Sequence, residues 1–217
     1  MKVSTDACLF GAYIDTGDAN TILDIGTGTG LIALMLAQRS NASIDAVDID
    51  ESAYKQARDN FNQSPWKDRL HAHHADIIEW YNHEEKKFDL VVSNPPFFDS
   101  HMKSGEKKKN LAKHSDALPL KELLDAVIRF LKPTGIFYLM LPEMEMEKFI
   151  AVAAKKELYL NKQLTVKNFK AGPVFRLICS FSFNLSPIIN DEIVIWQAKE
   201  KYTERFMELL KEYYLYI

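Results

Sequence analysis

Cysteine is scarce in this sequence, which has two cysteines among 217 residues. Cys8 and Cys179 lie far apart in apolar surroundings, a pattern typical of buried thiols in a reducing compartment rather than of a disulfide framework. Long apolar runs are also missing, since a stretch such as IFYLML at 136–141 is far shorter than the roughly 20 residues that cross a membrane. The first residues, MKVSTDAC, lack the apolar core of a signal peptide. We therefore expect a soluble cytoplasmic protein without a membrane partner.

The sequence also lacks a strong charge imbalance. Its 27 basic and 30 acidic residues give a formal net charge of -3, so a nucleic-acid partner would have to meet a local basic surface. Hydrophobic residues make up 47%, with only eight glycines and eight prolines, which is typical of a folded globular chain. Because no internal repeat or linker is visible, we expect residues 1–217 to form a single domain, and we expect a monomer.

Short apolar runs alternate with longer segments of helical period, which is the pattern of βαβ units and a parallel sheet. The predicted strands cover residues 21–26, 43–49, 69–76, 88–94, 135–141, 161–169 and 175–183. The predicted helices cover residues 30–40, 51–63, 120–132, 143–157 and 202–217. Only a Gly-Pro turn separates the last two strands, so they form an antiparallel hairpin. The predicted fold class is α/β, a doubly wound, mainly parallel seven-stranded sheet with a C-terminal antiparallel hairpin.

Three glycines follow the first predicted strand in the stretch LDIGTGTGL. Gly26, Gly28 and Gly30 allow the backbone to pass close to a ligand at the edge where open α/β sheets bind ligands. The dinucleotide fingerprint G-x-G-x-x-G would need a glycine at position 31, where the chain has Leu31, so a pyrophosphate ligand is disfavoured. Taken alone, the triplet is equally typical of a tight strand-to-helix turn that binds nothing.

Two aspartates end the next two predicted strands. Asp48 lies 22 residues after Gly26, where a carboxylate in this topology accepts hydrogen bonds from ribose hydroxyls. Asp76 is placed to accept the amino group of an adenine. Each aspartate on its own is also typical of a helix N-cap. Three strand ends facing one ligand nevertheless indicate a site for a nucleoside.

These motifs resemble the nucleoside-binding motifs of the class I methyltransferases, which have a Rossmann-like fold. The resemblance implies S-adenosylmethionine as the cofactor. It places the glycine backbone against the methionine and ribose moieties, Asp48 on the ribose, and Asp76 with Ile77 on the adenine.

The stretch VVSNPPFF at 91–98 carries the expected chemistry. Pro95 biases Asn94 away from the α region, and two fixed φ angles keep the loop extended and rigid. An exocyclic amine conjugated to a ring is a poor nucleophile. The Asn94 side-chain oxygen and the Pro95 carbonyl can each accept one N–H and so turn the lone pair toward the methyl group. Phe97 can stack on a base taken out of its helix or loop. In isolation, the motif is more simply explained as a proline strand terminator followed by a core phenylalanine. Downstream of the glycine turn and the two acidic strand ends it favours function, because these signals select the same cleft.

Further stretches resemble the bacterial tRNA1(Val) adenine-37 N6-methyltransferase family along essentially the whole chain. They are MKVSTDACLFGAY at the start, NQSPWKDRL at 62–70, SNPPFF, LPE at 141–143 and the ending EYYLYI. The resemblance implies methyl transfer to the exocyclic N6 of an adenine in tRNA, at position 37 of tRNA1(Val). Lys2, Thr5 and Asp6 match a family motif beside the cofactor pocket, although Thr5 or Asp6 could also cap the following helix. Family members carry a further segment before this motif, which we expect to be missing here.

The expected site residues fall into three groups. The catalytic group is Asn94, Pro95 and Phe97. The cofactor-binding group is Lys2, Thr5, Asp6, Asp24, Gly26, Thr27, Gly28, Gly30, Asp48, Ile49, Asp76, Ile77 and Asn94. The RNA-binding group is Pro96, Phe98, Lys103, Lys107, Lys108, Lys109, Lys113, Lys167, Lys170 and Arg176. Five of these lysines lie in a polar surface loop. Any single lysine there is better explained as solvated surface, whereas the loop as a group is expected to meet tRNA phosphates.

Other functions remain open. A release-factor glutamine N5-methyltransferase or an rRNA guanine N2-methyltransferase would use the same Asn-Pro-Pro geometry, whereas a non-catalytic RNA-binding protein of this fold would not bind the cofactor. His71, His73 and His74 lie on a predicted edge strand, where polar residues discourage edge pairing. Because no cysteine or acidic cluster completes a tetrahedral set around them, we expect no metal.

Overall fold

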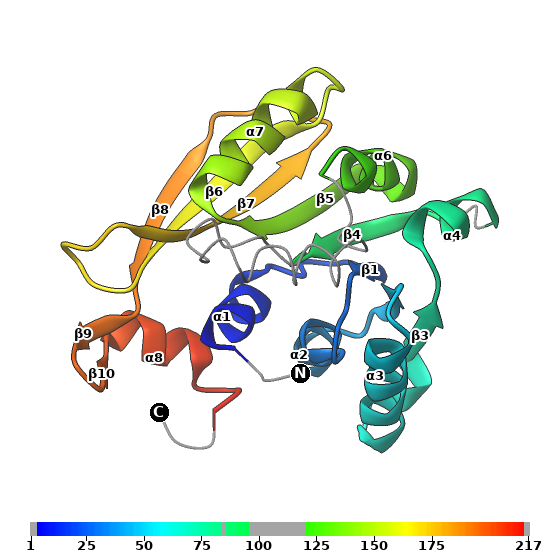
Figure 1. Cartoon of the computed structure of the whole chain (residues 1–217), viewed down its shortest axis with the longest axis horizontal. Helices are drawn as coiled ribbons and strands as arrows, with labels where there is room; N and C mark the ends of the chain where they lie inside the picture. Colours follow the sequence, from blue (N-terminus) through cyan, green and yellow to red (C-terminus); the bar gives the residue numbers. More distant parts are fainter. Residues whose placement is uncertain (1–3, 84–85, 96–119, 215–217) are drawn as a thin grey trace, which may run out of the picture.

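The computed structural model describes residues 4–83, 86–95 and 120–214. Its centre is an eight-stranded sheet in the order β3-β2-β1-β4-β5-β7-β6-β8 (Figure 1). The strands are β1 Thr21–Ile25, β2 Ser43–Asp48, β3 Leu70–His74, β4 Phe88–Ser93, β5 Leu131–Leu141, β6 Tyr159–Lys167, β7 Val174–Ser182 and β8 Ile189–Val194. The α-helices are α1 Thr5–Tyr13, α2 Leu31–Arg39, α3 Glu51–Gln63, α4 Ile77–His83, α6 Leu120–Phe130, α7 Glu143–Ala154 and α8 Glu204–Leu210. A 3-10 turn at Lys67–Arg69 and a small sheet of β9 Trp196–Ala198 and β10 Lys201–Tyr202 accompany them.

The eight strands are parallel except for β7, which pairs antiparallel with both β5 and β6. The carboxyl ends of the seven parallel strands therefore meet at one edge of the sheet, which we call the carboxyl edge. The opposite edge is the amino edge. This arrangement confirms the predicted doubly wound, mainly parallel sheet with its antiparallel hairpin.

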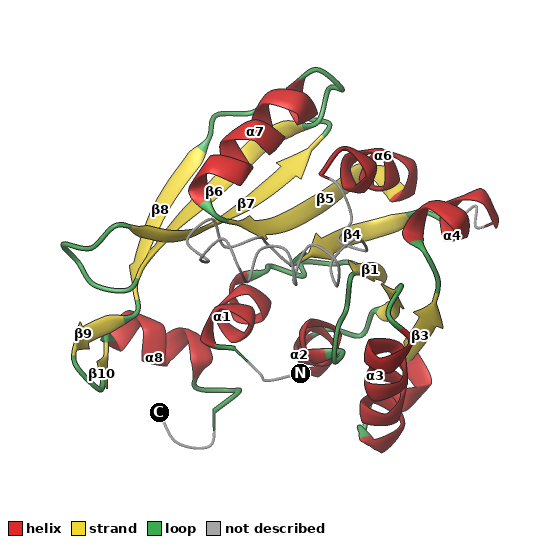
Figure 2. Ribbon diagram, viewed as in Figure 1, coloured by secondary structure: helices red, strands yellow, loops and turns green. Residues whose placement is uncertain are grey.

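The helices divide between the two faces of the sheet. One layer contains α1, α2, α3 and α8, and the other contains α4, α6 and α7 (Figure 2). Phe61 and Phe206 lie in the hydrophobic core under the first layer, and Phe130 and Phe149 lie in the core under the second. Because both faces are covered, the residues of the central strands β1 and β4 are buried almost without interruption instead of alternating between buried and exposed.

The prediction of seven strands is wrong by one, because β8 was not recognised. Its sequence, INDEIV, pairs in parallel with β6 at the end of the sheet. Ile193 is its one buried residue, so neither an apolar run nor a clear alternation marks it as a strand. β5 also begins at Leu131, earlier than the predicted start at 135, since Leu131 already pairs with Phe88 of β4.

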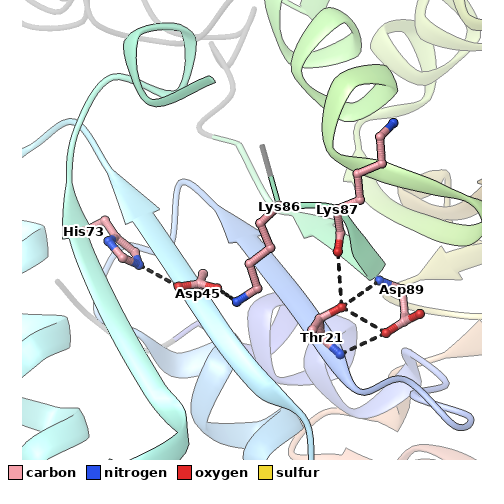
Figure 3. A network of polar contacts seen from close by, with 6 residues as sticks. All are labelled: Thr21, Asp45, His73, Lys86, Lys87 and Asp89. Atoms are coloured by element: carbon pink, nitrogen blue, oxygen red, sulfur yellow. Dashed lines mark hydrogen bonds and ion pairs between the residues drawn. The ribbon is translucent and has the colours of Figure 1, made fainter. Parts of the chain in front are cut away.

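A network of polar contacts ties the central strands together (Figure 3). The buried carboxylate of Asp45 on β2 lies 2.7 Å from Nε2 of His73 on β3 and 2.6 Å from Nζ of Lys86. Burial raises the pKa of Asp45, but the hydrogen bonds and charges of His73 and Lys86 outweigh it and leave the pKa below its ordinary value. At the amino edge, Asp89 of β4 accepts hydrogen bonds from the backbone N–H and the hydroxyl of Thr21 on β1.

We expect Asp45→Asn to lower the free energy of unfolding by about 1 to 3 kcal/mol at pH 7, because a nearly buried charge pair is lost. The pKa of Asp45 is depressed in the fold, so its stabilisation is present above the ordinary value of 3.8 and is lost as the pH falls through the folded value. Urea unfolding of wild type and variant should therefore give a difference that is constant near neutrality and shrinks below pH 3.8.

The matched control is Glu51→Gln, which breaks the exposed Glu51–Lys55 pair on α3. This variant should stay within about 0.5 kcal/mol of wild type, because exposed pairs contribute little. An Asp45→Asn effect equally small at pH 7, or undiminished in acid, would show that the network does not stabilise the fold through the Asp45 charge.

Candidate active site

The predicted site residues converge where the chain leaves β1, β2 and β4. In the parallel register, Ile25 is paired with Val47 on one side and with Ser93 on the other. Gly26 and Asn94 therefore follow β1 and β4, and Asp48 ends the adjacent β2, all at the carboxyl edge. The chain places β2 and β3 on one side of β1 and then crosses to the other side with β4. Open α/β sheets bind ligands at such a topological switch point.

The glycine turn after β1 has free space at Gly26 and tight packing at Gly30. Gly26 has φ +73° and Gly30 has φ +80°, both in the left-handed region that favours glycine. A Cβ added at Gly26 would meet nothing within 4 Å, whereas one at Gly30 would lie 2.4 Å from the Phe61 ring. Gly26 thus faces free space, and Gly30 allows α2 to pack against α3. The turn has room for a ligand at its first glycine.

Asp24 supports this turn from inside the protein. Its side chain is completely buried, and Oδ2 accepts a 2.7 Å hydrogen bond from the Thr27 hydroxyl. Burial raises the pKa of Asp24 to about 7, the Thr27 bond opposes this, and the charge of Asp48 adds to it. The carboxylate therefore holds Thr27 below the turn, and a direct contact of Asp24 with the cofactor stays a prediction.

Asp48 is fixed at the carboxyl edge by two backbone groups. Oδ2 accepts a 2.8 Å hydrogen bond from the Gly28 N–H, and Oδ1 accepts one of 2.9 Å from Asp50. Each carboxylate oxygen keeps a further lone pair for a ribose hydroxyl. The N-cap of α3 is Asp50, which accepts from Ala53, so the capping alternative for Asp48 is wrong. The next residue, Ile49, is 45% exposed and offers an apolar surface to a flat base.

Asp76 follows β3 and does cap a helix. Its Oδ1 accepts a 2.7 Å hydrogen bond from the Ile78 N–H at the start of α4, which confirms the capping alternative for this residue. Its second oxygen keeps acceptor capacity, and the Ala75 N–H donates to the Asp48 carbonyl at 3.1 Å, which joins the two strand ends. Ile77 is buried, so an adenine contact there would involve its backbone. A cavity of about 790 Å³ beside α6 also includes Asp76 in its lining, together with Glu122 of that helix.

Asn94 emerges beside the glycine turn. The hydroxyl of the preceding Ser93 donates a 2.9 Å hydrogen bond to the Ile25 carbonyl, which joins the ends of β4 and β1. The side-chain oxygen of Asn94 is buried and has no hydrogen-bond partner among the described residues. Pro95 is buried directly after it. A buried acceptor without a donor is costly, and a substrate N–H would satisfy it.

Several predicted residues lie outside the described part of the chain. They are Lys2, Pro96, Phe97, Phe98, Lys103, Lys107, Lys108, Lys109 and Lys113. Their proposed roles therefore stay predictions.

The start of α1 joins two of the predicted groups. Ser4 is the N-cap of α1, because its hydroxyl accepts from the Ala7 N–H, so Thr5 and Asp6 are not the cap. The carboxylate of Asp6 instead lies 3.7 Å from the guanidinium of Arg176 on β7. Asp6, which was predicted to bind the cofactor, and Arg176, which was predicted to bind RNA, thus form an ion pair between α1 and β7.

Two further contacts that shape the site could not be recognised from the sequence. Asn60 on α3 donates a 2.8 Å hydrogen bond from its side chain to the Thr29 carbonyl of the glycine turn. The Tyr54 ring stacks on His74 at 5.5 Å between centroids, and His74 contacts the Ile49 carbonyl. Both contacts join residues of α3 to strand ends, and helix periodicity alone does not reveal them.

The residues fit S-adenosylmethionine. Free space at Gly26, a fixed carboxylate at Asp48 and the apolar surface of Ile49 suit its methionine, ribose and adenine parts in that order. The described residues hold no cluster of three or more His, Cys, Asp or Glu side chains that could bind a metal. Within the same residues, no helix is both long and apolar enough to span a membrane.

A sheet of this order with such a site defines a class I S-adenosylmethionine-dependent methyltransferase. Solved structures with this fold include the predicted O-methyltransferase Atu636 from Agrobacterium tumefaciens, with a TM-score of 0.72 at 14% identity and 97% of each chain covered. Ribosomal protein L11 methylase from Lactobacillus delbrueckii subsp. bulgaricus has a TM-score of 0.56 at 16% identity, covering 82% of this chain and 77% of that one.

Residues 5–143 match the family model of the methyltransferase small domain, and the chain belongs to this family. It is 42% identical to a protein of Christiangramia forsetii, over 99% of this chain and 91% of the relative. It is 43% identical to a protein of Flavobacterium psychrophilum, over 99% of this chain and 93% of the relative. Both relatives are named tRNA1(Val) (adenine(37)-N6)-methyltransferase. The resemblance stated from the sequence motifs is thereby confirmed.

The two glycines with different surroundings give a paired test of the cofactor site. We expect Gly26→Ala to abolish measurable S-adenosylmethionine binding in calorimetry, because the new methyl group enters the free space, while the left-handed φ costs only about 1 to 2 kcal/mol of stability. Gly30→Ala should be the more destabilising change in thermal unfolding, since its methyl group meets the Phe61 ring. Unchanged cofactor affinity in Gly26→Ala would place the ligand elsewhere.

Proposed function

We propose that this protein transfers the methyl group of S-adenosylmethionine to the exocyclic N6 of adenine 37 in tRNA1(Val). The observation that carries the proposal is the buried side-chain oxygen of Asn94 beside the glycine turn, which has no hydrogen-bond partner in the described part of the chain. The names of the relatives support the choice of tRNA and of adenine 37. The position of Asn94 supports an attack by an amino group.

The chemistry required of the protein is orientation of that amino group. S-adenosylmethionine, when bound, supplies an electrophilic methyl group on a sulfonium. Asn94 Oδ1 accepts one N6–H, and the Pro95 carbonyl accepts the other, so the nitrogen lone pair turns out of conjugation and toward the methyl carbon. These fixed dipoles also stabilise the positive charge that develops on nitrogen. The methylated nitrogen is then acidic enough to release its extra proton to water without a separate base.

Other residues hold the reactants in place. Asp48 and Ile49 bind the nucleoside part of the cofactor, and Asp24 fixes the turn through Thr27. Phe97 stacks on the adenine in this proposal, because an aromatic ring after the two prolines can hold a base that has left its helix or loop.

We further propose that the protein acts as a single-domain monomer in the cytoplasm. The thiols of Cys8 and Cys179 are both free and buried, which suits a reducing compartment. Two hydrophobic cores on opposite faces of one sheet suit a single domain. The oligomeric state stays a prediction that sedimentation analysis would check.

Incubation with labelled S-adenosylmethionine and unmodified tRNA should place the label on N6 of an adenine, whereas release factor should remain unlabelled. We expect Asn94→Ala to reduce kcat by about 100-fold or more at saturating S-adenosylmethionine, because the amino group is no longer oriented toward the methyl carbon. Asn62→Ala, on the exposed surface of α3, is the matched control and should behave as wild type. Label on a glutamine amide instead of tRNA would overturn the proposal.

A further inference from the structure

The turn between β6 and β7 lies at the same edge of the sheet as the candidate active site. β6 runs parallel to β5 and ends at Lys167, and β7 returns antiparallel from Val174. Residues 168–173, which we call the hairpin tip, therefore extend from the carboxyl edge, where Gly26 and Asn94 also lie. In Figure 1 the hairpin tip is the yellow loop beyond the ends of β6 and β7.

Main-chain hydrogen bonds hold the hairpin tip in one conformation. The Gly172 N–H donates to the Phe169 carbonyl at 2.8 Å and closes the turn. At its base, the N–H groups of Ile195 and Trp196 donate to the carbonyls of Lys167 and Asn168, both at 2.9 Å. The segment after β8 thus braces the hairpin. A braced turn presents its side chains without a large entropic cost on binding.

The hairpin tip exposes an aromatic ring. Phe169 is 48% exposed, and it is the one aromatic among the large exposed hydrophobic side chains of the described ranges. Exposed phenylalanine is unfavourable in water, since about 25 cal/mol is lost for each Å² of apolar surface left uncovered. Its ring is therefore accessible to a partner at the end of the braced turn.

The charge beside this ring is positive and accessible. Lys170 is exposed next to Phe169. Two other cations predicted to bind RNA have acidic partners within the chain, since Lys167 lies 2.7 Å from Glu192 and Arg176 lies 3.7 Å from Asp6. Lys170 is consequently the cation of the hairpin best placed for a phosphate, with an aromatic face beside it.

We propose that the hairpin tip is a second RNA contact, in which Phe169 stacks on an unpaired base of the substrate tRNA and Lys170 binds a neighbouring phosphate. An aromatic face beside a cation is the combination that binds unpaired nucleotides without sequence preference. A lipid surface would need several apolar side chains together with the cation. This inference rests on the proposed tRNA substrate and adds a contact outside the cleft that receives the target adenine.

Steady-state kinetics with a full-length tRNA1(Val) transcript test the contact. We expect Phe169→Ala to raise the KM for tRNA about five- to a hundredfold, with kcat and the KM for S-adenosylmethionine unchanged, because the ring contacts RNA away from the reacting atoms. Phe169→Trp should keep wild-type values, since it retains a stacking face. Phe169→Leu should behave as Phe169→Ala, because it is apolar without a π face.

The control variant is Leu185→Ala, which removes a side chain that is 79% exposed in the segment after β7, at the amino edge. Its KM for tRNA should equal that of wild type. An unchanged KM in Phe169→Ala, or a Phe169→Leu variant as good as wild type, would overturn the stacking contact. A parallel rise in the KM for S-adenosylmethionine would mean that the variant disturbs the fold instead.

Binding measured without methyl transfer separates this inference from the proposed function. The anisotropy of fluorescently labelled tRNA should rise on addition of wild-type protein. The Kd for tRNA should increase in both Phe169→Ala and Lys170→Ala. In Lys170→Ala the Kd should also depend less on salt concentration, because one phosphate contact is lost. If wild type binds tRNA through the hairpin tip but methylates none, the proposed function fails and the RNA contact stands. If wild type methylates tRNA and both hairpin variants bind it equally well, the contact fails and the function stands.

Discussion

The parallel pairing of β1 with β4 is the constraint on which the site depends. Adjacent strands lie about 4.8 Å apart, so the pairing of Ile25 with Ser93 sets the glycine turn directly beside Asn94. Methyl transfer needs its two reacting atoms within about 3 to 3.5 Å, and a slip of one residue would turn every side chain of β4 to the other face. The bond from the Ser93 hydroxyl to the Ile25 carbonyl fixes the register at its last residue.

Two carboxylates at these strand ends have opposite environments and divided roles. Asp48 is hydrogen-bonded to backbone N–H groups at the edge, whereas Asp24 is buried below the turn, where its pKa rises to about 7. Because the folded state holds the Asp24 proton more tightly than the unfolded chain does, ionisation of this carboxyl lowers stability between pH 3.8 and about 7. The buried carboxyl under the turn therefore lowers stability, and it also fixes the position of Thr27.

The sequence predicted the features that arise from local pattern. Buried strands contain continuous apolar runs, such as LVV of β4. The glycine turn and Asn94 directly follow the strands that position them, and Asp48 ends its strand. β8 was missed because an edge strand with one buried residue carries no pattern. The partners of Asp6 and Lys167 were also beyond prediction, since both ion pairs join segments that are brought together only by the packed sheet.

The one antiparallel strand of the large sheet, β7, explains how the same edge carries both the candidate active site and the hairpin tip that we propose to bind RNA. If β7 ran parallel to β5, a crossover would be needed between β6 and β7, and their connection would cross a face of the sheet. Running antiparallel, β7 allows a six-residue turn to extend from the carboxyl edge, at residues 168–173. β8 then returns parallel to β6 and delivers Ile195 and Trp196 to brace that turn. β8, which carries no recognisable sequence pattern, thus leads into the segment that supports the hairpin tip.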